Sequence, residues 1–93
     1  MLVIVRSAPD TSEGRRGVRI ARSMNADIVL VQNGVYFAQE DRLEGFHKTA
    51  YVLEDDIRLR GIRDYSANQR IKSINYDGLV DLMTERDKVI GMF

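Results

Sequence analysis

The sequence predicts an α/β protein with three layers, α/β/α, around a mostly parallel sheet of about five strands. Short apolar runs alternate along the 93 residues with segments of helical spacing. That alternation is typical of strand–helix–strand units, whose connections leave the strands parallel and cover both faces of the sheet with helices. A chain of this length builds one hydrophobic core, so we predict a single domain, residues 1–93.

The predicted strands are short and rich in β-branched residues. Leu2–Arg6 (LVIVR) and Asp27–Val31 (DIVLV) have the continuous apolar pattern of strands buried on both faces. Thr49–Leu53 (TAYVL) is the third strand and Ile71–Ile74 (IKSI) is a shorter fourth. The segment Lys88–Phe93 (KVIGMF) is the candidate for the fifth strand.

The segment between the first two strands is predicted to be a helix, Thr11–Met24. Its apolar residues recur at helical spacing and define a core-facing stripe: Val18, Ala21 and Met24. Asp10 precedes Glu13 by three residues, which is a variant of the capping box. We therefore expect Asp10 to cap this helix.

Two further helices are predicted in the second half of the chain. One follows the third strand directly, because three acids at its start suit the helix dipole and Gly61 suits the position just past its end. The other runs from Tyr76 to about Arg86. Its core-facing stripe is expected to consist of four apolar residues: Leu79, Val80, Leu82 and Met83.

A polar break after the second strand marks the candidate site. In open parallel sheets, ligands bind outside the carboxyl ends of the strands. The sequence Gln32-Asn33-Gly34 lies at that edge, where Gly34 permits a positive φ or a close backbone approach and Asn33 tolerates left-handed geometry. Tyr36 and Phe37 follow, and either line a pocket, contact a neighbouring subunit or pack beneath the next loop.

Composition excludes several kinds of chemistry. The chain has no cysteine and a single histidine, His47. This removes disulfides and thiol chemistry from the chain, and one histidine cannot build a zinc site by itself. No G-x-S-x-G motif and no phosphate-binding glycine motif is present, so neither a conventional hydrolase nor a nucleotide cofactor is indicated. We expect no metal and no cofactor.

Charge and hydropathy indicate where the protein acts. Fourteen basic and fourteen acidic residues give a net charge of zero, so direct nucleic-acid binding is not indicated. The longest apolar runs, Leu2–Val5 and Ile28–Val31, are far too short to span a membrane. The N-terminus also lacks the pattern of a secretory signal, and we expect a cytoplasmic protein without membrane contact.

Two charged groups have both a functional and a structural interpretation. Arg15, Arg19 and Arg22 form one row of the first helix, which is either a docking face for an acidic partner or RNA phosphates, or a solvated helix face. The acids of residues 54–56 are either paired carboxylates for acid–base chemistry or the stabilised start of a helix. If these acids are catalytic, the protein would be an enzyme that uses Asp56 together with His47.

Four stretches, in the same order and spanning nearly the whole chain, resemble the DsrH/TusB family of small sulfur-relay subunits. They are RSAP (Arg6–Pro9), IVLVQNGVYFA (Ile28–Ala38), AYVLEDDIRLRGI (Ala50–Ile62) and INYDGLVDLMTERDKVIGMF (Ile74–Phe93). Each stretch is weak alone, and the ordered set is more specific. The resemblance implies the DsrE/DsrF/DsrH type of parallel α/β fold.

The resemblance also implies a function and partners. Such proteins form hetero-oligomers with DsrE/TusD-like and DsrF/TusC-like subunits, and they pass persulfide sulfur toward 2-thiolation of the tRNA wobble uridine or within sulfur oxidation. Many DsrH-type members have a cysteine near the first helix, whereas GRRGVRIARSM here has none. The chain is thus expected to be a non-catalytic subunit that contributes contact surface. The expected contact residues are Gly34, Tyr36, Phe37 and the C-terminal segment that includes Met92 and Phe93.

An alternative function remains open from the sequence. The same fold would also suit a stand-alone homo-oligomer that binds a small ligand at the Gln32–Phe37 edge, without any role in sulfur transfer.

Overall fold

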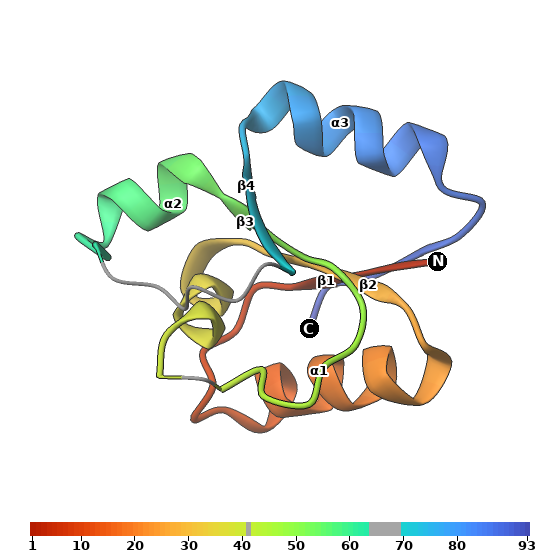
Figure 1. Ribbon diagram of the computed structural model, residues 1–93, viewed down its shortest axis with the longest axis horizontal. Coiled ribbons are helices and arrows are strands. Elements are labelled where there is room, and N and C mark those ends of the chain that lie inside the picture. The colour runs from red at the N-terminus through yellow and green to blue at the C-terminus, as the bar shows by residue number, and fades with distance from the viewer. Residues whose placement is uncertain (41, 64–69) are drawn as a thin grey trace.

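All five strands of the sheet are parallel. The computed structural model describes residues 1–40, 42–63 and 70–93, and its strands have the order β4-β3-β2-β1-β5 (Figure 1). The strands are β1 (Leu2–Val5), β2 (Asp27–Leu30), β3 (Ala50–Leu53), β4 (Ile71–Ile74) and β5 (Val89–Ile90). In the register, Val3 lies beside Ile28 and Ile90, and Ile28 lies beside Ala50. The predicted fold class is therefore confirmed, and the sheet is parallel throughout.

Helices cover the sheet from two sides. The helical elements are α1 (Ser12–Met24), the 3₁₀ helix η1 (Gln32–Ala38), α2 (Glu54–Leu59) and α3 (Tyr76–Glu85). In Figure 1, α1 lies below the sheet and α3 lies above it, whereas α2 continues from the end of β3. Because β4 and β5 are the two edge strands, the connection through α3 crosses the whole upper face.

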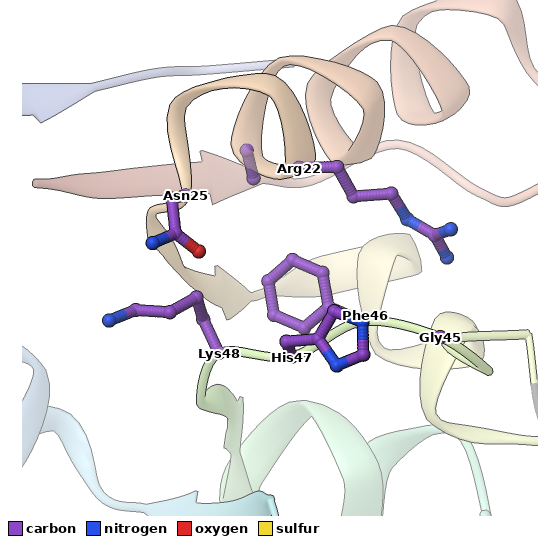
Figure 2. A pocket seen from close by; sticks show the side chains of 7 residues that line it. Arg22, Asn25, Gly45, Phe46, His47 and Lys48 are labelled. Carbon is purple, nitrogen blue, oxygen red and sulfur yellow. The ribbon is translucent and has the colours of Figure 1, made fainter.

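The face beneath α1 holds the larger core. Alternate strand residues, such as Val5, Leu30 and Val52, are fully buried there against α1 and η1. The loop after η1 closes this core, because Phe46 is buried in it and the Arg22 guanidinium of α1 donates to the carbonyl of Glu44 at 3.2 Å. Figure 2 shows the small hollow, about 100 Å³, that remains between the end of α1 and this loop.

The face beneath α3 holds the smaller core. Its buried residues come from the strands and from Val31 just after β2, among them Leu2, Ile4 and Val29. Leu79 and Leu82 of α3 pack on this cluster while only half-buried, and α3 has no fully buried residue.

The predicted core stripe of α3 is only half correct. Leu79 and Leu82 face the sheet, but Val80 and Met83 are 57% and 40% exposed. With about 100° of rotation per residue, the two exposed residues lie roughly a quarter-turn around the helix from the inward pair. Together with Tyr76, which is 55% exposed, they form what we call the outer stripe: Tyr76, Val80 and Met83.

A partly buried ion pair fastens the end of α3 to the sheet. Arg86, just past α3, donates from Nη1 to Asp27 Oδ2 at 2.7 Å, and the Thr49 N–H donates to Asp27 Oδ1 at 2.9 Å. Burial alone would raise the pKa of Asp27, but the hydrogen bonds from Arg86 and Thr49 outweigh it and hold this pKa below its ordinary value of 3.8. The hydrogen bond to Asp27 raises the pKa of Arg86 in turn.

Two predictions about α1 are wrong at its ends. The N-cap is Thr11, whose Oγ1 accepts from the Gly14 N–H at 3.1 Å, and not Asp10. The helix begins at Ser12, so Asp10 lies one residue too early to reach the first free N–H groups. Met24 is 43% exposed because it is the last helical residue, after which Asn25 turns the chain with a φ of 53°.

Candidate functional site

The candidate site lies at the carboxyl edge of the sheet, as the sequence predicted. There β1 continues into Arg6, β2 into η1 and β3 into α2, while the C-terminal segment arrives beside β1. The polar break Gln32-Asn33-Gly34 is thus the first turn of η1.

Gly34 holds η1 against the end of β1. Its N–H donates to the carbonyls of Val31 and Arg6, and a Cβ at this position would lie only 2.2 Å from the Val5 oxygen. Gly34 therefore serves the close approach that the sequence predicted and not a positive φ. The left-handed residue of the break is Gln32, with a φ of 50°, whereas Asn33 had been expected there. Asn33 instead takes part in a side-chain network, which fixes it in the helical turn.

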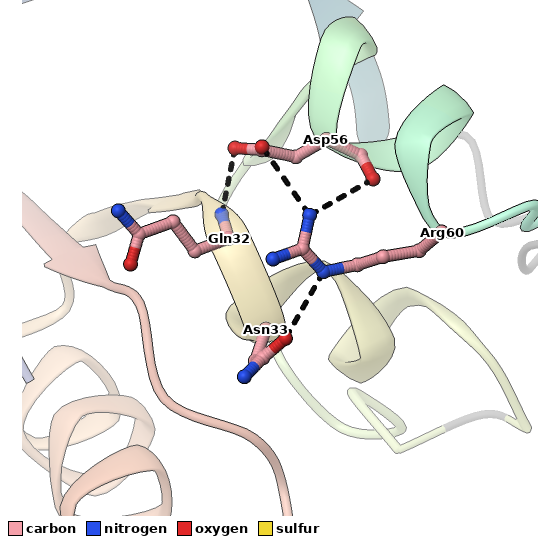
Figure 3. A network of polar contacts seen from close by, with 4 residues as sticks. All are labelled: Gln32, Asn33, Asp56 and Arg60. Atoms are coloured by element: carbon pink, nitrogen blue, oxygen red, sulfur yellow. Dashed lines mark hydrogen bonds and ion pairs between the residues drawn. The ribbon is translucent and has the colours of Figure 1, made fainter.

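Asp56 organises that network from the start of α2 (Figure 3). Its Oδ2 accepts from the Gln32 N–H at 2.7 Å, and its Oδ1 pairs with Arg60 Nη1 at 3.3 Å. Arg60 also donates from Nε to Asn33 Oδ1 at 3.0 Å. Asp56 is 7% exposed and both of its carboxylate oxygens are engaged, so it ties α2 to η1 and offers no free oxygen for acid–base chemistry.

The C-terminal segment fills the edge between β5 and β1. The Phe93 N–H donates to the carbonyl of Ile4, and the main-chain oxygen of Phe93 accepts from the N–H groups of Arg6 and Ser7. Gly17 of α1 makes room for the Phe93 side chain, since a Cβ there would lie 2.7 Å from Phe93 Cβ. Met92 is 52% exposed, so of the two predicted contact residues Met92 is available at the surface and Phe93 is packed.

The two aromatics after the break have different environments. Phe37 is 5% exposed and belongs to the core beneath α1. Tyr36 is half-buried and lines an open hollow of about 360 Å³ together with Pro9, Gln39 and Arg42.

The predicted arginine row forms one wall of another hollow. Arg15, Arg19 and Arg22 line it from α1, and Arg42 lines it from the loop beyond η1. Val18 and Phe37 complete the lining of this space, about 280 Å³. We call it the arginine hollow, defined by Arg15, Val18, Arg19, Arg22, Phe37 and Arg42. Sequence reasoning missed Arg42, because nothing in the local sequence shows that the loop folds back onto α1.

His47 and Asp56 are not brought together. His47 precedes β3 and lines the hollow of Figure 2, whereas Asp56 follows β3 at the opposite edge of the sheet. A four-residue strand alone spans roughly 13 Å, so the two side chains do not share a site. In the described part of the chain, no group of three or more His, Cys, Asp or Glu residues is arranged to hold a metal ion. Within the same residues, no helix has the length and apolar character needed to cross a membrane.

The fold defines a class of small α/β proteins with an all-parallel five-stranded sheet. In this chain the C-terminal segment lies at the carboxyl edge of that sheet, beside β1. Residues 15–89 match the model of the family described as "DsrH like protein". This chain therefore belongs to the DsrH family, and the resemblance found in the sequence is confirmed.

A solved structure is similar to this chain in sequence and in fold. The solution NMR structure of Protein Tm0979 from Thermotoga maritima is 32% identical in sequence, with a TM-score of 0.61. The alignment covers 98% of this chain and 100% of that one. A comparison with proteins of curated function finds no match.

Proposed function

We propose that this chain is a structural subunit of a sulfur-relay complex of the DsrEFH/TusBCD type. It would support persulfide transfer toward 2-thiolation of the tRNA wobble uridine or within sulfur oxidation, while DsrE-like and DsrF-like partners supply the chemistry. The observation that carries this proposal is a DsrH-family chain with no cysteine.

The missing cysteine determines the division of roles. A persulfide relay moves the outer sulfur of one cysteine persulfide to the thiolate of another cysteine, and only a thiolate serves as that acceptor. A chain without cysteine forms no such intermediate itself. Its contribution to a relay must come from surface that positions or completes a partner.

The outer stripe of α3 supplies a suitable surface. Three large side chains, Tyr76, Val80 and Met83, are 40% to 57% exposed on one side of a helix that itself has no buried residue. Adjacent exposed apolar side chains of this kind are typical of protein–protein contacts, in which tyrosine and methionine are enriched. A partner seated there would bury this stripe.

The proposal is tested by gentle capture of the tagged chain from its own host, followed by native mass spectrometry. We expect a stoichiometric complex with cysteine-bearing DsrE-like or DsrF-like chains. The purified chain, incubated alone with a persulfide donor, should gain no sulfur mass. Recovery of the chain only as a homo-oligomer would instead favour the alternative, a self-sufficient ligand-binding protein of the same fold.

A further inference from the structure

The arginine hollow has an unbalanced charge. Four arginine side chains line it, and the described lining residues include no carboxylate. Arg42 pairs with Glu40 at 2.9 Å, and that is the one ion pair among the four arginines in the described residues. Four positive charges less one negative charge leave three that are not neutralised within this part of the chain.

The geometry separates this hollow from an ordinary solvated helix face. A solvated arginine row comes from one helix alone, whereas here the exposed Arg42 reaches the same shallow, solvent-open space from a different segment. Arg42 is held in place by donating from Nη1 to the Tyr36 carbonyl at 2.9 Å, and Arg22 is held by its bond to the Glu44 carbonyl. Two of the four side chains are thus positioned before any ligand arrives, which reduces the entropy lost on binding.

We propose that the arginine hollow binds a compact polyanion of the di- or triphosphate class. Guanidinium groups bind phosphate oxygens in bidentate fashion, and several of them together match the charge of a phosphoanhydride. The space of about 280 Å³ is at the small end for ligand pockets. A single carboxylate from an acidic peptide would neutralise only one of the three excess charges.

This site is independent of the subunit role proposed above. It lies beneath the sheet between α1 and the loop after η1, whereas the outer stripe lies on α3 above the sheet (Figure 1). Neither proposal requires the other, and each has its own test.

The test uses inorganic pyrophosphate as the probe and follows the arginine Nε–H signals of the purified chain by NMR. We expect saturable shifts for the arginines of the hollow, and binding that weakens as the ionic strength rises. ADP titrated in parallel distinguishes the source of the phosphates. Tighter binding of ADP than of pyrophosphate would point to a nucleotide, and equal binding to the phosphate groups alone.

Two neighbouring arginines provide a matched control. Arg19 lines the hollow and Arg16 does not, yet both are exposed on α1. Arg19→Glu should weaken pyrophosphate binding by about tenfold or more, because it both removes a donor and adds a repulsive charge. Arg16→Glu changes the net charge of the chain equally and should leave binding within about twofold of wild type. Arg15→Gln and Arg16→Gln again compare an arginine of the hollow with one outside it, without a charge reversal. They serve as the test if either substitution to Glu disturbs the fold.

Three results would overturn the proposal. The first is the absence of saturable binding by the wild-type chain at low salt. The second is an equal loss in the Arg19 and Arg16 variants, which would reduce the effect to net charge. The third is binding of a single-stranded RNA oligomer without binding of pyrophosphate, which would assign the arginines to a nucleic-acid backbone.

Discussion

The two faces of the sheet are built differently. Beneath the sheet, α1, η1 and the loop after η1 bury strand residues completely, and glycines allow backbone segments to touch. Above the sheet, α3 covers the strands with two half-buried leucines that face inward and three large side chains that are exposed. The central strand residues are buried on both faces, but the helix above the sheet leaves a stripe of three large side chains exposed.

This difference bears on the proposed subunit contact as well as on stability. A chain of this size buries a modest share of its surface on folding, so a stripe of exposed apolar side chains is a natural place for a second subunit. Predictions on the lower face should therefore appear in the stability of the isolated chain. Predictions on the outer stripe of α3 should appear mostly in its complexes.

The largest effect is expected at the contact between η1 and β1. Gly34→Ala would place a methyl group 2.2 Å from the Val5 oxygen, a backbone atom that cannot move without the sheet. We expect a loss of about 3 kcal/mol in the free energy of unfolding, measured by urea titration. Gly61→Ala is the control, because it has a φ of 63° but no atom nearby, and backbone strain alone should cost only about 1 kcal/mol. Equal losses would mean that η1 is not tightly packed.

The next effect concerns the buried carboxylate that joins α2 to η1. Asp56→Ala leaves the Gln32 N–H and the Arg60 guanidinium without their acceptor, which should cost about 2 kcal/mol. Asp55→Ala removes an exposed pair with Arg58 and should cost less than about 0.5 kcal/mol. Chemical denaturation of both variants measures the difference. If Asp56→Ala leaves the free energy of unfolding unchanged, the network does not stabilise this edge.

Truncation of α3 should separate its inner side from its outer side. Leu82→Ala removes a half-buried side chain from the upper cluster and should cost about 1.5 kcal/mol, which is below the range for full burial. Val80→Ala lies on the outer stripe and should change the stability of the isolated chain by no more than about 0.5 kcal/mol. If the two losses are equal, the outer stripe is already buried by the isolated chain, and the comparison between the faces fails.

The smallest effect is a pH dependence at the ion pair between Asp27 and Arg86, which holds the end of α3 to the sheet. The pKa of Asp27 is lowered in the folded protein, so its contribution to stability is present above the ordinary value of 3.8. It is lost as the pH falls below that value through the folded pKa. Asp27→Asn should lower the free energy of unfolding by about 1 kcal/mol near neutral pH. The difference in this free energy between the variant and wild type should become smaller in acid. Urea unfolding curves between about pH 7 and pH 2.5 measure it, with Asp55→Asn as the exposed control. A gap that does not change with pH would mean that the Asp27 charge contributes nothing.

The sequence predicted the sheet and the position of its carboxyl edge well because both depend on local patterns. Apolar β-branched runs specify buried parallel strands, and strands that are parallel must bring their carboxyl ends together. The break at Gln32-Asn33-Gly34 could be placed at that edge for the same reason. Close packing at Gly34 was anticipated from residue type alone.

What escaped prediction depends on contacts between distant segments. Arg86 pairs with Asp27 across 59 positions, and Arg42 joins α1 through a loop whose path no local pattern specifies. Asp56 was recognised as a helix-start acid, but not as the acceptor for the Gln32 N–H. The apolar periodicity predicted the helix α3 correctly. Periodicity does not distinguish a side chain that faces the sheet from an apolar side chain that is exposed on the outer side of the helix.

The most direct test of the account is a pair of matched substitutions on opposite faces. Met83 on α3 and Met24 at the end of α1 are 40% and 43% exposed, so Met→Lys at either position adds one charge at little cost to the fold. Native mass spectrometry of the captured tagged chains should show that Met83→Lys loses its DsrE-like or DsrF-like partners while Met24→Lys retains them. Retention of partners by Met83→Lys, or recovery of the wild-type chain without any partner, would contradict the claim that α3 presents the surface of a sulfur-relay subunit.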